Sequence, residues 1–393
     1  MAEPGIVFED RANAAPGLHV LIVGVSCYDY LGGGPAPPRP EFRQPATQLA
    51  QLSGPALSAA KLAQFFVSRK AKWGKPLSTC RVLLSPARDG SEDAGLSNFE
   101  GWARASYDNL KLALTGWHDD AAKDTDGAAL FYFSGHGIQR SPGDAVLLPA
   151  DFLGGTTYLD RAVDVNQIYN GMAPSKLFPD MARQQFFFID ACQADFSIFR
   201  DFPSETTPPI FIRPNSGADS RVAPIYYAAA PGRETFAVQG DGTRFGTDLL
   251  NSLRGLGGCN ASPGGLPAEW CVTVGSLAEA LEALRTQFND ERGFTIRTSR
   301  IDKFTDTHTV LHRLDGPPVV DCILRFLPDN AAHQAKVSIG MPWDPPFNPL
   351  MNPHKFTRPA GFYFIKGDSP PFQPYQQPLI VEPPFTTWTV QFS

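Results

Sequence analysis

Two apolar stretches of the sequence each end at a residue that can do covalent chemistry. Residues 129–140 read ALFYFSGHGIQR, and residues 185–196 read QFFFIDACQADF. A cysteine beside a histidine is the basic equipment of thiol catalysis, because the imidazole favours the reactive thiolate and later protonates the leaving amine. This chemistry requires a fold that brings His136 and Cys192 together.

The two stretches read as buried strands within a longer alternating pattern. The alternation predicts an α/β fold, in which helices sandwich a mostly parallel sheet. Reactive groups in such sheets lie outside the carboxyl ends of the strands, so the third and fourth strands would deliver His136 and Cys192 to one edge. The predicted strands are 19–28, 80–85, 127–135, 184–191 and 223–230, and the predicted helices are 56–72, 98–123, 245–255 and 273–292.

Glycines flank the histidine on both sides, at positions 135 and 137. A residue without Cβ lets a substrate backbone come close and lets the chain turn sharply at a strand end. The backbone N–H groups of Gly137 and Cys192 are candidates for binding the oxyanion of a tetrahedral intermediate.

The combination of YFSGHG with FFFIDACQADF about 55 residues later resembles the caspase-like cysteine peptidases, and within them the metacaspase-like branch. That family is known to carry a histidine about 50 residues before its cysteine. The resemblance covers residues 17–310 and includes VLIVGVSCY, AAAPGRETF and GTRFGTDLL. It implies that His136 is the base, that Cys192 is the nucleophile, and that a backbone carbonyl near the end of the first strand orients the histidine.

The resemblance also places the residue two before the cysteine in the pocket for the side chain that precedes the cut. That residue is Asp190, and Asp29 is placed to add a second carboxylate. Carboxylates in a semi-enclosed pocket favour a cationic guest, which predicts cleavage after Arg or Lys. Cleavage after Asp stays open as an alternative, because Arg233 follows the fifth strand where aspartate-specific caspases place a pocket arginine.

The segment between Cys192 and the fifth strand is polar and rich in proline, so we expect a long exposed loop. Relatives are often cut there, and a pocket for arginine makes Arg200, Arg213 and Arg221 candidate self-cleavage sites. The same loop contains Asp195 and Asp201, which leave calcium binding open as an alternative. No other cofactor and no metal site is expected, since no Cys/His cluster has zinc spacing.

The sequence predicts three parts: an N-terminal extension (1–16), the peptidase domain (17–315) and a small antiparallel β-rich domain (316–393). The last part is rich in proline and aromatic residues and has short alternating apolar runs. An alternative function follows from it: an inactive or conditional caspase-like scaffold whose C-terminal domain binds a regulatory partner.

Composition excludes several other classes. A hydrophobic content of 42% and a charged content of 19% indicate a folded globular protein, and a net charge of −6 argues against nucleic acid as a partner. No apolar run approaches a membrane span and no signal peptide is visible, so the expected location is the cytoplasm. A nucleotide- or flavin-binding protein is disfavoured, because no G-x-G-x-x-G or P-loop follows the first strand.

The expected activity is therefore a cytoplasmic cysteine endopeptidase that acts on protein or peptide substrates. The resemblance places such proteins in microbial stress or defence pathways.

Reduced thiols are the default for the cysteines of this chain, with a bridge between Cys259 and Cys271 as an open alternative. The six cysteines are Cys27, Cys80, Cys192, Cys259, Cys271 and Cys322.

Overall fold

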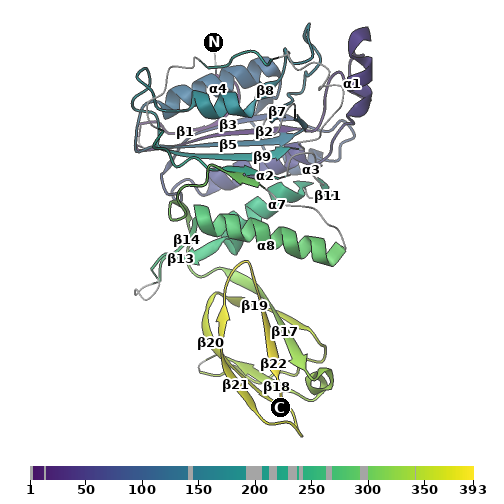
Figure 1. The fold of residues 1–393 in the computed structure, drawn as a ribbon, viewed down its shortest axis with the longest axis vertical. Helices are drawn as coiled ribbons and strands as arrows, with labels where there is room; N and C mark the ends of the chain where they lie inside the picture. Colours follow the sequence, from purple (N-terminus) through teal and green to yellow (C-terminus); the bar gives the residue numbers. More distant parts are fainter. Residues whose placement is uncertain are drawn as a thin grey trace. The chain divides into compact units, whose positions relative to one another are not determined.

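The computed structural model divides the chain into two compact units (Figure 1). The first unit contains residues 1–250 and 293–306, and the second contains residues 251–292 and 307–393. The structure describes residues 3–12, 15–139, 145–191, 206–211, 219–228, 237–238, 242–262, 268–292, 300–340 and 342–393.

The first unit is built on one sheet whose central strands run parallel. Strands β3, β2, β5, β9 and β10 are parallel neighbours in that order, and the two outer strands, β1 and β15, are antiparallel. A short strand, β4, also pairs with β3. The strands are β1 (Ile6–Glu9), β2 (Leu18–Val25), β3 (Leu77–Ser85), β4 (Ala103–Arg104), β5 (Ala128–Gly135), β9 (Gln184–Ala191), β10 (Ile225–Tyr227) and β15 (Arg300–Asp302).

Helices cover both faces of this sheet, with α4 on one face and α2 on the other (Figure 1). Every residue of β2 and β5 is buried, as expected for strands that are covered on both sides. On the α4 face, Trp117 packs against Phe131 and Phe187 with ring centroids 6.0 and 6.3 Å apart. The helices are η1 (Pro40–Phe42), α1 (Arg43–Gln48), α2 (Pro55–Ser68), α3 (Asp93–Leu96), α4 (Tyr107–Ala121), α5 (Val165–Gly171) and α7 (Arg244–Asn251).

Two small sheets complete the first unit. Strands β6 (Gly137–Ile138), β7 (Val146–Leu147) and β8 (Val163–Asp164) form one, which starts directly after His136. Strands β11 (Ala237–Val238) and β12 (Gly242–Thr243) form the other.

The second unit combines a helix and a three-stranded sheet with a β-rich C-terminal part. Its first elements are η2 (Ser252–Leu256), β13 (Gly258–Asn260), β14 (Trp270–Thr273), α8 (Val274–Arg292) and β16 (Val310–Arg313). The C-terminal part has two three-stranded sheets, ordered β19-β17-β22 and β18-β20-β21. Its elements are β17 (Val319–Leu327), η3 (Asp329–His333), β18 (Lys336–Ile339), β19 (His354–Pro359), β20 (Gly361–Asp368), β21 (Tyr375–Val381) and β22 (Phe385–Gln391).

The structure confirms the predicted α/β class with an additional β-rich part, and it differs from the prediction in detail. Helix α4 begins at Tyr107 rather than near residue 98, because Ser106 caps it by accepting a hydrogen bond from the Asn109 N–H. Strand β17 pairs with β22 in parallel, although the remaining C-terminal pairs are antiparallel. The predicted domain boundary at 315/316 stays a prediction. The compact units divide the chain elsewhere, because they place residues 251–292 in the same unit as the C-terminal strands.

Among the residues that the structure describes, no helix combines the length and the apolar character needed to cross a membrane.

Candidate active site

The carboxyl ends of β5 and β9 lie side by side in the first unit. The parallel register pairs Ser134 with Asp190 and Gly135 with Ala191. The residue after Gly135 is His136, and the residue after Ala191 is Cys192, which lies outside the described residues. The chain neighbours of the two predicted reactive residues are therefore directly opposite each other.

The imidazole of His136 is held by a backbone carbonyl. Its Nε2 lies 2.7 Å from the Ala50 carbonyl oxygen, which fixes the proton on Nε2 and leaves Nδ1 as the basic nitrogen. The His136 backbone N–H donates to the Tyr28 hydroxyl at 2.6 Å, and the two rings lie 4.9 Å apart. Burial lowers the pKa of His136 to about 4, although the bond to Ala50 opposes this shift.

The glycine before the histidine is required by close packing. A Cβ at Gly135 would lie 2.7 Å from the Tyr28 hydroxyl oxygen and 3.2 Å from the Val25 Cβ. Gly137 follows in β6 and is paired with Leu147. Its part in an oxyanion site stays a prediction, because that site also includes Cys192.

The carbonyl that orients His136 comes from the loop before α2, about 25 residues beyond the end of β2. Two contacts hold this loop beside the strand end. The Leu52 N–H donates to the Ser26 carbonyl at 2.9 Å, and Gln51 accepts from the Tyr28 N–H at 2.7 Å. The loop thus lies close to the first strand only through tertiary contacts.

Glu92 anchors the end of the same loop. Its buried carboxylate accepts from the Gly54 N–H at 2.7 Å, from the Ser26 hydroxyl at 2.8 Å and from the Ala87 N–H at 2.7 Å. Gly54 is the N-cap residue of α2 and has no side chain, so Glu92 supplies the missing cap from another part of the chain. Sequence reasoning did not identify Glu92, because no local pattern links it to a helix that begins 37 residues earlier.

Asp190 lies on the α2 face of the sheet, and its side chain is buried. One carboxylate oxygen, Oδ2, accepts hydrogen bonds from Tyr132 at 3.0 Å, from Ser134 at 2.8 Å and from the Thr243 hydroxyl. The other oxygen, Oδ1, has no partner within the described part of the chain. Burial raises the pKa of Asp190, and the three hydroxyl donors oppose that shift.

The surroundings of Asp190 are tied to α2. The Thr243 N–H donates to the Ser58 hydroxyl at 2.8 Å, and the two hydroxyl oxygens lie 3.1 Å apart. A Cβ at Gly54 would lie 2.9 Å from the Gly242 carbonyl carbon. The first turn of α2 therefore lies between the loop that orients His136 and the residues Gly242 and Thr243 beside Asp190.

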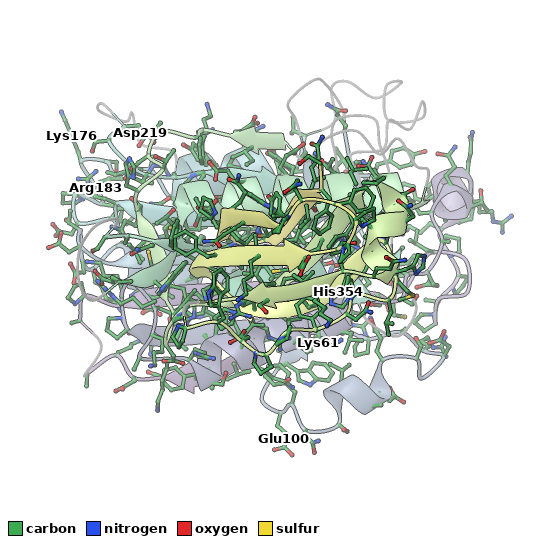
Figure 2. All side chains as sticks on the ribbon, turned by 90° about the horizontal axis from the view of Figure 1, so that it is seen from below. Lys61, Glu100, Lys176, Arg183, Asp219 and His354 are labelled. Atoms are coloured by element: carbon green, nitrogen blue, oxygen red, sulfur yellow. The ribbon has the colours of Figure 1, made fainter. Side chains whose placement is uncertain are left out.

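Asp29 and Arg221 are placed differently from Asp190. The Asp29 carboxylate forms an ion pair with Arg104, so a cationic guest would compete with that arginine. Arg221 is buried, and its guanidinium donates to Gln185 at 2.7 Å and to Asp219 at 2.7 Å. The hydrogen bond from Arg221 lowers the pKa of Asp219, and the charge of Arg183, which Figure 2 labels on the same side of the molecule, lowers it further.

The burial of Arg221 argues against it as a cleavage site, because a protease needs an extended and accessible chain. The other predicted residues of the long loop lie outside the described residues, and so does Arg233 after the fifth strand; those of the loop are Asp195, Arg200, Asp201 and Arg213. Within the described ranges, no group of three or more His, Cys, Asp or Glu side chains is arranged to hold a metal ion.

This chain matches the model of the Caspase domain, peptidase family C14, over residues 19–301. The match covers most of the sheet of the first unit, without β1, and includes the ends of β5 and β9. The chain belongs to this family and is a cysteine peptidase, which acts on protein or peptide substrates.

Individual relatives are more distant. An uncharacterized protein of Sinorhizobium fredii is 27% identical over 258 residues, which is 64% of this chain and 70% of that protein. A probable protease of a Desulfuromonadales bacterium is 28% identical over 222 residues, or 53% of this chain, but the match spans only 24% of that protein. The crystal structure of caspase-1 from Spodoptera frugiperda is 13% identical, with a TM-score of 0.43 and coverage of 76% of this chain and 90% of that one. The family model, rather than any of these similarities, carries the assignment.

Proposed function

We propose that this chain is an endopeptidase that uses His136 and Cys192 as a catalytic dyad and cleaves after Arg or Lys. The observation that carries the dyad is the register of β5 and β9, which places Gly135 opposite Ala191. The bond from His136 Nε2 to Ala50 supports the role of the histidine, because it orients the imidazole without an acidic side chain.

In the proposed reaction, the Cys192 thiolate attacks the substrate carbonyl after its proton passes to His136 Nδ1. The backbone N–H groups of Gly137 and Cys192 bind the oxyanion. His136 then protonates the leaving amine, and a water molecule hydrolyses the acyl-enzyme. Burial lowers the pKa of His136 to about 4, so the imidazole is neutral at pH 7 and its Nδ1 carries no proton before the reaction.

The proposed preference for Arg or Lys depends on the free oxygen of Asp190. Three donors occupy Oδ2, while Oδ1 is buried without a partner in the described residues. A buried acceptor that lacks a donor is costly, and a guanidinium or ammonium would satisfy it. Asp29 is the second proposed carboxylate, and its pairing with Arg104 makes it the weaker of the two.

A panel of fluorogenic peptides with Arg, Lys, Asp or Ala before the cut tests this proposal. Cys192→Ala and His136→Ala should each lower kcat/KM by about 10⁴-fold or more. Asp190→Asn should lower kcat/KM for the Arg peptide by about 10²-fold, because it removes the charge that pairs with the guest. Asp29→Asn is the matched control, with a smaller expected effect. Faster cleavage after Asp than after Arg would overturn the basic preference.

Self-processing after Arg200 or Arg213 is proposed as part of the same activity. The intact mass of the purified wild type, compared with that of Cys192→Ala, measures it directly. Two fragments only in the wild type are expected, and identical single chains would contradict self-processing. If an active-site alkylator labels Cys192 while no peptide is cleaved, the chain is a conditional protease that needs a trigger.

A further inference from the structure

Two cysteines of the second unit lie opposite each other on neighbouring strands. Cys259 on β13 and Cys271 on β14 are register partners in an antiparallel pair, and both thiols are free. The Cα atoms of such partners are about 4.5 to 5.5 Å apart, which is within the range that a disulfide spans. Partners in register also point to the same face of the sheet. The register therefore brings the two residues within the Cα separation that a disulfide requires.

The Cys259 sulfur lies at the N-terminus of a long helix. It is 4.0 Å from the hydroxyl oxygen of Thr273, the residue before α8. Thr273 and Ser276 form the reciprocal bonds of a helix cap, at 2.9 and 3.1 Å. The dipole of α8 favours negative charge at this position, which stabilises a thiolate.

The Cys271 thiol also favours a thiolate on Cys259. Its hydrogen bond to Cys259 is the largest cause that lowers the pKa of Cys259, and the hydroxyls of Ser276 and Thr273 add to it. The pKa of Cys271 is raised by the same contact. One sulfur is therefore prepared to attack, and its partner keeps its proton until the second step.

Access also differs between the two thiols. Cys259 is partly exposed and lines a cavity of about 480 Å³ together with Asn260, Trp270 and Ser276, whereas Cys271 is only 1% exposed. A small oxidant can reach the first sulfur from this cavity. The second sulfur is reached through the first.

We propose that Cys259 and Cys271 are a reversible dithiol–disulfide site that reacts with hydroperoxides. The Cys259 thiolate attacks one peroxide oxygen, the O–O bond breaks, and the other oxygen leaves as hydroxide and takes up a proton. The Cys271 sulfur then attacks the sulfenic acid on Cys259, the S–O bond breaks, and the second oxygen leaves as water with the thiol proton. Two thiols and one hydrogen peroxide thus give one disulfide and two waters, and a dithiol reductant reverses the change.

Three other cysteines provide internal comparisons. Burial raises the pKa of Cys80 to about 12 and that of Cys322 to about 11, and it also raises the pKa of Cys27. These thiols should react slowly, because the thiolate is the reactive form. The proposal is independent of the peptidase dyad, since both cysteines lie in the second unit.

Peptide mapping of the full chain tests the proposal. The Cys192→Ala variant, which lacks the proposed nucleophile, is treated with hydrogen peroxide, quenched with catalase, blocked with N-ethylmaleimide and digested. The expected product is a peptide that joins Cys259 to Cys271, with the loss of two alkylated thiols that dithiothreitol restores. A Cys271→Ser variant should give no such peptide and should accumulate a sulfenic acid on Cys259 that dimedone traps.

A Cys322→Ser variant is the matched control and should form the same disulfide as its parent. Alkylation of both Cys259 and Cys271 after peroxide treatment would overturn the proposal. Dimedone labelling spread over the other cysteines, with Cys259 unlabelled, would overturn it as well. Because the first measurement does not depend on a substituted Cys271, it decides the question even if that variant fails to fold.

Discussion

At the scale of single residues, burial sets the charge of the groups at the ends of β5 and β9. His136 is 7% exposed, and its lowered pKa keeps the imidazole neutral at physiological pH. Asp190 is 2% exposed and keeps three hydroxyl donors, which offset the cost of a buried carboxylate. The same buried surroundings therefore keep the imidazole uncharged and make the Asp190 carboxylate depend on its hydroxyl donors.

The pH dependence of kcat/KM should show this burial. As pH falls through the folded-state pKa of His136, Nδ1 takes up a proton and can no longer accept one from Cys192. We expect the acid limb to lie below 6.5, toward about 4, because burial penalises the charged imidazole. An acid limb at 6.5 or above would contradict this account.

A peptide with citrulline before the cut is the control for that profile. Protonation of Asp190 at low pH weakens the binding of an Arg peptide, because the guanidinium then loses its ion pair. Citrulline is uncharged and forms no ion pair with Asp190, so protonation of Asp190 should not weaken the binding of the citrulline peptide in this way. A limb that appears with both peptides belongs to the dyad. A limb that appears only with the Arg peptide belongs to Asp190.

At the scale of elements, α2 connects the two halves of the candidate site. Its first turn presents Ser58 to Thr243, and the loop before it presents the Ala50 carbonyl to His136. Glu92 and Ser26 hold this N-terminus, since the Ala56 N–H donates to the Ser26 hydroxyl at 3.0 Å. A change in the contacts that cap α2 should therefore alter the position of the His136 imidazole.

Glu92→Gln should lower the free energy of unfolding by about 1 to 3 kcal/mol, because a neutral amide accepts weaker hydrogen bonds and places an NH₂ group against a backbone N–H. It should also lower kcat, since the Ala50 loop loses its anchor. Thermal unfolding and peptide kinetics measure the two effects. Glu100→Gln, at the exposed position labelled in Figure 2, is the matched control and should change neither. A loss of stability with an unchanged kcat would restrict Glu92 to a structural role.

The sequence predicted the elements of the sheet better than it predicted the contacts between loops. Apolar runs identify β2, β5 and β9 because strands covered on both faces are mostly apolar. The carbonyl that orients His136 belongs to Ala50, and nothing in the residue type marks it, since any residue carries a backbone carbonyl. The cap from Glu92 and the bond from Thr243 to Asp190 join positions far apart in the chain, so no local periodicity encodes them. A bridge between Cys259 and Cys271 was only an open alternative to reduced thiols, because the register of β13 and β14, which makes the two residues partners, is not visible in the sequence.

At the scale of the whole molecule, the polypeptide on either side of the long loop belongs to one sheet. Strand β10 pairs with β9, and the Gln185 N–H donates to the Val222 carbonyl at 2.8 Å. The buried Arg221 adds bonds to Gln185 and to the Tyr169 carbonyl at 3.0 Å. These contacts would hold the segment before the long loop to the segment after it even if the chain between them were cut.

A cut in the loop should leave the two fragments associated. If a site for a foreign protease is inserted after Arg213 in the Cys192→Ala variant, cleavage should give two bands on a denaturing gel and one peak in size-exclusion chromatography. In denaturant the fragments should separate. Separate elution without denaturant would show that the contacts of β9 with β10 do not hold the halves together.

Each compact unit is made of two stretches of chain. The chain passes from one unit to the other between residues 250 and 251, between 292 and 293, and between 306 and 307. A single recombination breakpoint in the gene therefore cannot add or remove the second unit as a whole. A deletion that starts after residue 315 would leave β13, β14, α8 and β16 behind without the C-terminal strands of their own unit. The C-terminal strands thus share a compact unit with an internal segment, 251–292, that lies within the family match, while the strands themselves lie beyond it.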